Sequence, residues 1–182
     1  MSLDYIAVQL PELYPYVMLA AGGISFQCLL VGFGAGGKRK TIFGTEAMKE
    51  KFNEEHQKHF KADVPKDGYP DHGEGMYGDM LSYEDWYKFS TDQSGHKRFL
   101  EDVTVIVFNL LVIGLAFPIV SISLACLNFV LRWFLVCCNK GGPVHYKFRM
   151  YSSGFKHLVD IAMLIMTIWS ASVFISDIPK VE

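Results

Sequence analysis

The sequence predicts an all-α integral membrane protein: a four-helix transmembrane bundle with a large polar loop between its first and second helices. Of the 182 residues, 51% are hydrophobic, and the mean hydropathy of +0.20 is too apolar for an average soluble domain. Charged residues make up 20%, too many for a bundle confined to lipid, so one substantial polar segment is expected. Four stretches are long and apolar enough to cross a hydrocarbon core of about 30 Å, which predicts a single membrane domain over residues 1–182.

The first predicted span covers residues 14–35 and contains no charged residue. Its small residues allow a second helix to approach closely. Gly32–Gly37 formally matches the GxGxxG pattern of dinucleotide-binding proteins, but that pattern requires a strand before it and a helix after it. Here a membrane helix precedes it and the basic run Lys38–Lys40 follows, so we exclude a dinucleotide site and predict that the glycines end the helix.

The polar insert covers residues 36–81 and is predicted to contain one solvated helix. Thr45 is placed to cap a helix over residues 46–60, whose charges are spaced as on a water-facing surface. His56 and His59 stand three residues apart, but no third ligand follows at a suitable spacing, so we predict a surface helix and no metal site. The glycine- and proline-rich segment that follows is predicted to be a loop.

Three further spans follow the insert. Ser82 and Asp85 occupy the positions of a capping box at the head of a long second helix, which begins polar and becomes apolar at Val103. Pro118 is placed to open the third helix. The predicted ranges are residues 83–117, 119–138 and 155–176.

Lysine and arginine residues near the ends of the spans predict the orientation. They gather in the first and third connections and are missing from the second. We therefore expect residues 36–81 and 139–154 on the positive-inside face, which is the cytosol or the mitochondrial matrix, and both termini on the opposite face.

Net charge and cysteine placement exclude several classes of function. A net charge of −2 with no basic tract interleaved with aromatic residues gives no argument for nucleic acid. The four cysteines lie within or at the edge of apolar segments, which is unlike a zinc site or a disulfide framework, so we expect small buried side chains. These cysteines are Cys28, Cys126, Cys137 and Cys138. Acylation of the last two, at a membrane edge, is the alternative.

Ionisable residues near the positive-inside ends of three helices predict a structural polar network. Glu101, Arg132 and Asp160 come to the same membrane face in this topology, and a charge at that depth is costly unless it is paired. Two interpretations stay open: an ion-pair network that fixes the register of the helices, or a site for an anionic ligand or a thiolate. His96 and Arg98 lie within two turns of Glu101 and belong to the second interpretation.

The insert and the start of the second helix carry a family resemblance. The segment Tyr69-Pro70-Asp71-x-Gly73-x-Gly75-x-Tyr77, followed by Leu81-Ser82-Tyr83 and Trp86, resembles a MAPEG subgroup with an enlarged first loop. MAPEG proteins are membrane proteins of eicosanoid and glutathione metabolism, including microsomal glutathione transferases. The resemblance covers roughly residues 13–176 in architecture. It implies a glutathione site at Glu101, Arg98, His96 and Arg132, with Arg132 and Arg98 as the catalytic residues of an active member, and a homotrimer.

The matched positions depart from the family pattern. Its second-helix motif Arg-x-His-x-Asn-x-x-Glu meets Ser94, His96, Arg98 and Glu101, so the first Arg and the Asn are changed. Its third-helix motif Arg-x-x-Tyr-x-x-Gly-Tyr meets Arg132, Leu135, Cys138 and Asn139, so only the Arg is kept. Ser94 does not offer the planar fork of an Arg to a carboxylate, and Leu135 donates no hydrogen bond to a thiolate. These changes predict a vestigial site, with Arg98 as the one candidate to replace the missing Arg.

We therefore expect a non-catalytic MAPEG-like protein that serves as an accessory subunit of a larger membrane complex and needs no cofactor. A respiratory-chain assembly of the mitochondrial inner membrane is the favoured host, with the endoplasmic reticulum as the alternative location. The expected partners are other membrane subunits and phospholipids. Two alternative functions remain: a glutathione-dependent transferase or peroxidase acting as a homotrimer, and a lipid-binding scaffold using Arg132, Lys147 and Arg149.

Overall fold

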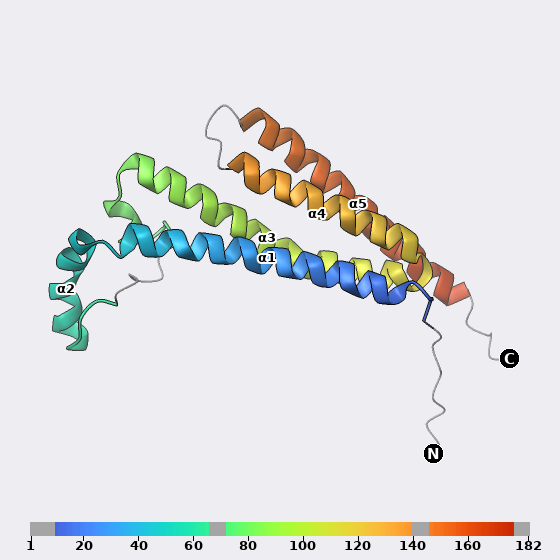
Figure 1. Ribbon diagram of the computed structural model, residues 1–182, viewed down its shortest axis with the longest axis horizontal. Helices are drawn as coiled ribbons and strands as arrows, with labels where there is room; N and C mark the ends of the chain where they lie inside the picture. Colours follow the sequence, from blue (N-terminus) through green and yellow to red (C-terminus); the bar gives the residue numbers. More distant parts are fainter. Residues whose placement is uncertain (1–9, 66–71, 140–145, 177–182) are drawn as a thin grey trace, which may run out of the picture. The chain divides into compact units, whose positions relative to one another are not determined.

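The computed structural model describes residues 10–65, 72–139 and 146–176, and within these ranges every regular element is a helix (Figure 1). Four of the helices are long and apolar enough to cross a membrane, which makes the chain an integral multi-pass membrane protein and confirms the predicted all-α class with four membrane helices. The elements are α1 (Tyr14–Phe43), α2 (Glu46–Phe60), the short 3-10 helix η1 (Gly78–Met80), α3 (Tyr83–Ala116), α4 (Pro118–Asn139) and α5 (Tyr146–Ser176).

Two predicted helix ends are wrong. Helix α1 continues through all the glycines of Gly32–Gly37 and ends at Phe43, because these glycines adopt ordinary helical angles; Gly73 is the one described glycine with a positive φ. Helix α5 begins at Tyr146 rather than at residue 155, because the basic segment contains no proline and continues the helix directly into the span. The connection between α1 and α3 is therefore shorter than the predicted insert, because α1 extends to Phe43, and it includes α2 and η1.

The chain divides into two compact units, which are described separately. The bundle unit comprises Met1–Gln27, Asp102–Leu135 and Lys147–Glu182, so it contains one part of each long helix. The insert unit comprises Cys28–Glu101 and Val136–Tyr146, and it contains α2, η1 and the remaining parts of α1 and α3.

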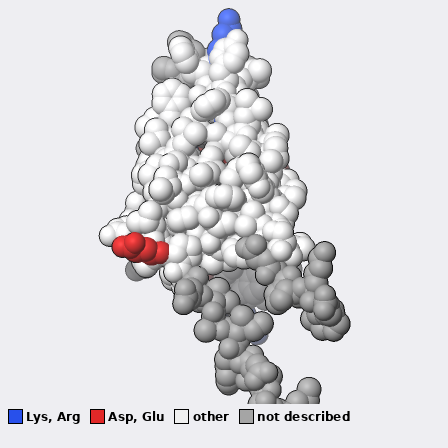
Figure 2. Space-filling model, turned by 90° about the vertical axis from the view of Figure 1, so that its right-hand side faces the viewer, with Lys and Arg blue, Asp and Glu red and all other residues white. Residues whose placement is uncertain are grey.

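The bundle unit has a narrow core and an apolar exterior. Its four helix segments bury small and aliphatic side chains: Val17, Ala21 and Ile24 on α1, Ile106, Leu110 and Ile113 on α3, Ala125 on α4, and Val159 and Met163 on α5. Val17 packs directly over Gly114, and Ser121 of α4 donates a 2.7 Å hydrogen bond from Oγ to the carbonyl of Leu110. Many large apolar side chains point outward, and the face in Figure 2 shows hardly any charged side chain. Such a surface suits lipid contact.

The insert unit is held together by aromatic side chains. Thr45 caps α2, as predicted, by accepting a hydrogen bond from the amide of Met48. Phe43 makes edge contacts with Tyr77 and Phe89, at 4.9 Å between ring centroids for Phe89. These three side chains form a buried cluster against which Ile42, Met48, Phe52 and Leu81 pack.

The family-like loop folds back onto the start of α3. Trp86 donates a 3.0 Å hydrogen bond from Nε1 to the carbonyl of Gly73. Gly73 has φ +88°, and a Cβ there would lie 2.8 Å from Ser90 Oγ, so a side chain is excluded by both conformation and space. Ser82 Oγ accepts from the amide of Asp85 at 3.1 Å and donates to its carboxylate at 2.7 Å. Tyr69, Pro70 and Asp71 of the motif lie outside the described residues.

The contact between α1 and α3 predicts an effect of substitution at Gly114. A Cβ at this position would lie 2.6 Å from Cγ1 of Val17, so Gly114→Leu should lower the free energy of unfolding by about 1–3 kcal/mol through overpacking. Gly22→Leu is the matched control, because nothing lies within 4 Å of a Cβ there. Thermal unfolding in phosphatidylcholine nanodiscs measures both variants, and equal melting temperatures would contradict the packing.

The end of α2 predicts a local dependence on pH. Asp63 accepts hydrogen bonds from Gln57 Nε2 at 2.7 Å and from Asn53 Nδ2 at 3.3 Å, and these bonds hold the pKa of its carboxyl below the ordinary value. Since the folded pKa is lowered, the stabilisation is present above the unfolded pKa of about 3.9 and is lost as the pH falls through the folded pKa.

Amide hydrogen exchange in the last turn of α2 should therefore speed up, beyond its intrinsic pH dependence, as the pH falls below about 4. Asp63→Asn keeps an oxygen acceptor but does not titrate, so its exchange should not show this added acceleration. The same profile in both proteins would exclude Asp63 as the cause.

Candidate functional site

The polar start of α3 packs along α1 within the insert unit. A Cβ at Gly32 would lie 2.6 Å from Nε2 of His96, which is too close, so the glycine makes room for the imidazole. Gln93 donates from Nε2 to the carbonyl of Ala35 at 3.3 Å, and Asp92 forms an ion pair with Lys38. His96 therefore occupies a packing position between two helices.

The other residues of α3 at the positions matched to the family motif have different surroundings. Ser94, Arg98 and Glu101 are exposed, whereas His96 is half-buried. All four belong to the insert unit, whereas Arg132, which the family resemblance also implies for the site, belongs to the bundle unit.

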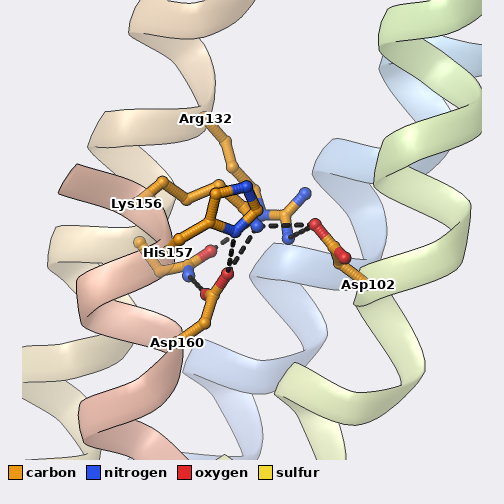
Figure 3. A network of polar contacts seen from close by, with 6 residues as sticks. Asp102, Arg132, Lys156, His157 and Asp160 are labelled. Carbon is orange, nitrogen blue, oxygen red and sulfur yellow. Dashed lines mark hydrogen bonds and ion pairs between the residues drawn. The ribbon is translucent and has the colours of Figure 1, made fainter. Parts of the chain in front are cut away.

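The bundle unit contains a second polar cluster, with side chains from three helices pointing toward one another (Figure 3). Lys156 of α5 is at its centre: Nζ lies 2.5 Å from Oδ2 of Asp102 on α3 and 2.5 Å from Oδ2 of Asp160 one turn along α5. Arg132 of α4 donates to Asp102 at 3.4 Å through a terminal nitrogen and to Asn128 Oδ1 at 2.8 Å through Nε. Asn128 Nδ2 donates to Asp160 at 3.1 Å and connects the two sides of the cluster.

We call Asp102, Asn128, Arg132, Lys156 and Asp160 the charge cluster. Its two cations and two carboxylates balance, and its geometry places the cations innermost. The side chains of Arg132 and Lys156 are 5% and 6% exposed, whereas those of Asp102 and Asp160 are 35% and 25% exposed. Outside the cluster, His157 Nδ1 approaches Asp160 at 3.7 Å from an exposed position.

The structure brings together two of the three residues predicted for the polar network. The structure brings Arg132 and Asp160 together through Asn128, but the carboxylate from α3 is Asp102 and not Glu101. Helical periodicity explains the difference: Asp102 shares the inner face with buried Ile106, whereas Glu101 shares the outer face with exposed Val105. This signal was available in the sequence.

Lys156 and Asn128 are the residues that sequence reasoning missed. Each has a partner four residues away on its own helix: Lys156 with Asp160, and Asn128 with Arg132. Pairs at this spacing face the same side of a helix, and their occurrence inside an apolar span was the signal for a shared polar site.

The described residues show no grouped metal ligands, and most of the cysteines are more exposed than predicted. Across residues 10–65, 72–139 and 146–176, no group of three or more His, Cys, Asp or Glu side chains is arranged to hold a metal ion. His59 on α2 approaches Glu55 at 3.4 Å instead. Cys28 is buried as predicted, but Cys126 and Cys137 are exposed and Cys138 is half-buried, so the prediction of four buried cysteines is wrong.

The chain was compared with protein-family models, with curated proteins and with solved structures, and nothing matches in any of the three.

The geometry of the charge cluster predicts that substitutions at the adjacent residues Asp102 and Glu101 affect stability differently. Asp102→Leu leaves two buried cations with one carboxylate, and should lower the free energy of unfolding by about 2–4 kcal/mol, somewhat less than for a fully buried pair because Asp102 is 35% exposed. Glu101→Gln changes an exposed neighbour and should stay within about 0.5 kcal/mol of the native protein. Unfolding in nanodiscs measures both, and a larger effect at Glu101 would reverse the assignment.

Proposed function

We propose that this chain is a non-catalytic, MAPEG-like membrane protein that serves as an accessory subunit of a larger membrane assembly. The observation that carries the proposal is the internal neutralisation of the charge cluster. Arg132, the cation that the family resemblance assigns to catalysis, is buried and is hydrogen-bonded to Asn128 and Asp102 of the same chain. A glutathione carboxylate or thiolate would have to displace these partners to reach it.

The environment of His96 supports the same conclusion. Its ring lies against Gly32, so this retained family residue has a packing contact that needs no ligand. Ser94 stands where the family pattern has an Arg and Leu135 where it has a Tyr, so two donor groups for glutathione are missing. Arg98 is exposed and is the one cation of α3 at the matched positions.

An exposed aromatic patch supports the role of a subunit. Tyr83 is 77% exposed, and its ring centroid lies 6.0 Å from that of Trp86 and 6.2 Å from that of Tyr87. The patch is about 24–30 Å along α3 from Val103, where the apolar half of the helix begins, so it lies outside the lipid. Contiguous exposed aromatic side chains in water are typical of protein contact sites, and another subunit of the assembly is the proposed occupant.

The proposed orientation follows from the distribution of lysine and arginine residues near the ends of the spans. Residues 36–81 and 139–154 face the positive-inside compartment, and both termini face the opposite side. We propose the mitochondrial inner membrane, with a respiratory-chain assembly as host and phospholipids at the apolar exterior, and the endoplasmic reticulum as the alternative location.

Gentle solubilisation followed by native electrophoresis and mass spectrometry tests the proposal. The native chain should migrate with other membrane proteins. Tyr83→Glu combined with Tyr87→Glu should weaken this association at least tenfold, because two charges enter an apolar contact. Phe60→Glu, on an exposed residue of α2, should leave it unchanged. A native chain that migrates as a free homotrimer would contradict the accessory role.

Binding of glutathione distinguishes the accessory role from the glutathione-dependent alternative. Calorimetric titration of the purified chain with millimolar glutathione should give no heat of binding if the site is vestigial. Saturable binding that is lost in Arg98→Ala would favour a transferase or peroxidase.

The structure weakens the lipid-scaffold alternative at one of its three residues. Arg132 is not available to bind a lipid headgroup, because its side chain is buried and hydrogen-bonded to Asn128.

A further inference from the structure

One buried polar atom in the bundle unit has no hydrogen-bond partner. The Gln27 side chain of α1 is 1% exposed, and its Nε2 donates a 3.0 Å hydrogen bond to the carbonyl of Phe129 on α4. Among the described residues, its Oε1 is the one buried side-chain nitrogen or oxygen without a partner. Reversing the amide would not repair this, because Oε1 would then face the Phe129 carbonyl and Nε2 would be unpaired.

Gln27 lies in the same layer of the bundle unit as the charge cluster. At about 1.5 Å per residue, Gln27 is about 20 Å from the start of α1, while Asp102 and Arg132 are each about 21 Å from the nearby ends of α3 and α4. The packing of Val17 on Gly114 fixes the antiparallel register of α1 and α3, and it places Gln27 opposite Thr104, close to Asp102. Phe129 itself follows Asn128 of the cluster directly in sequence.

The ammonium group of Lys156 has one N–H donor that is not directed to another residue of the charge cluster. An ammonium group has three N–H donors, and Lys156 directs two of them to Asp102 and Asp160. A third donor and the unpaired Oε1 acceptor therefore lie in one buried layer. A water molecule satisfies both, because it accepts from one group and donates to the other, and buried waters typically have two to four such polar partners.

We propose that an internal water site lies between Gln27 Oε1 and the ammonium of Lys156 and extends the charge cluster to α1. The ligand is water rather than a lipid or a larger solute, because Gln27 is almost completely enclosed. The partly exposed carboxylates of Asp102 and Asp160 are the side from which water enters. With this site, all four membrane helices contribute to one hydrogen-bonded layer.

The first test uses the native chain in phosphatidylcholine nanodiscs with nitrogen-15-labelled glutamine. Magnetisation transfer from water should reach the Gln27 side-chain amide as strongly as that of Gln57, which is exposed on α2. Gln27→Met assigns the signal and removes the acceptor at similar length. No transfer to Gln27 while Gln57 responds would overturn the proposal.

The second test separates a bridging water from one that touches Gln27 alone. Water transfer to the Lys156 ammonium should fall at least twofold in Gln27→Met, because the bridging partner is lost. Ser25→Ala, two residues away and hydrogen-bonded to its own helix, should leave it unchanged. If Gln27→Met does not fold, a density map of the native protein that resolves waters decides: a water within hydrogen-bonding distance of both Oε1 and Nζ supports the bridge, and a direct protein donor at Oε1 excludes it.

Discussion

Pairing of charge inside lipid is the constraint on which the bundle unit depends. Arg132 and Lys156 are almost fully enclosed in a region where an unpaired cation is severely destabilising. Asp102 and Asp160 satisfy them only if α3, α4 and α5 present particular faces to one another at a particular height. The cluster therefore fixes the rotation and register of three helices. Contacts between apolar side chains specify these two properties poorly, because the side chains can contact lipid equally well.

The two units are stabilised by different interactions, because the bundle unit is surrounded by lipid and the core of the insert unit is shielded from water. In the bundle unit, apolar side chains face outward as well as inward, so close backbone approach and internal hydrogen bonds give the helices their specific contacts. In the insert unit, the Phe43, Tyr77 and Phe89 cluster is buried away from water, as in the core of a soluble protein. The glycines of the family-like loop serve that second core, since Gly73 lies directly against Ser90 and Phe89.

Composition and apolar length were enough to predict the four spans, because the thickness of a membrane fixes both. Local chemistry was enough for the Thr45 cap and for α2. Local chemistry was not enough for the glycine run Gly32–Gly37, which was predicted to end the first helix: α1 continues through it, and Gly32 serves as a close-packing position beside His96. In the charge cluster, the residue types were predictable, but the choice of Asp102 over Glu101 required the rotation of α3, which follows from its buried face.

The short spacing between Lys156 and Asp160 also bears on how the chain enters a membrane. These two residues neutralise each other within a single helix, so α5 carries no net buried charge from this pair before it meets any neighbour. Arg132 of α4 has no such acidic partner on its own helix, but α3, with Asp102, precedes α4 in the sequence. Synthesis from the N-terminus therefore delivers each carboxylate before, or on the same helix as, the buried cation that it pairs with, so neither Arg132 nor Lys156 enters the membrane ahead of an acidic partner.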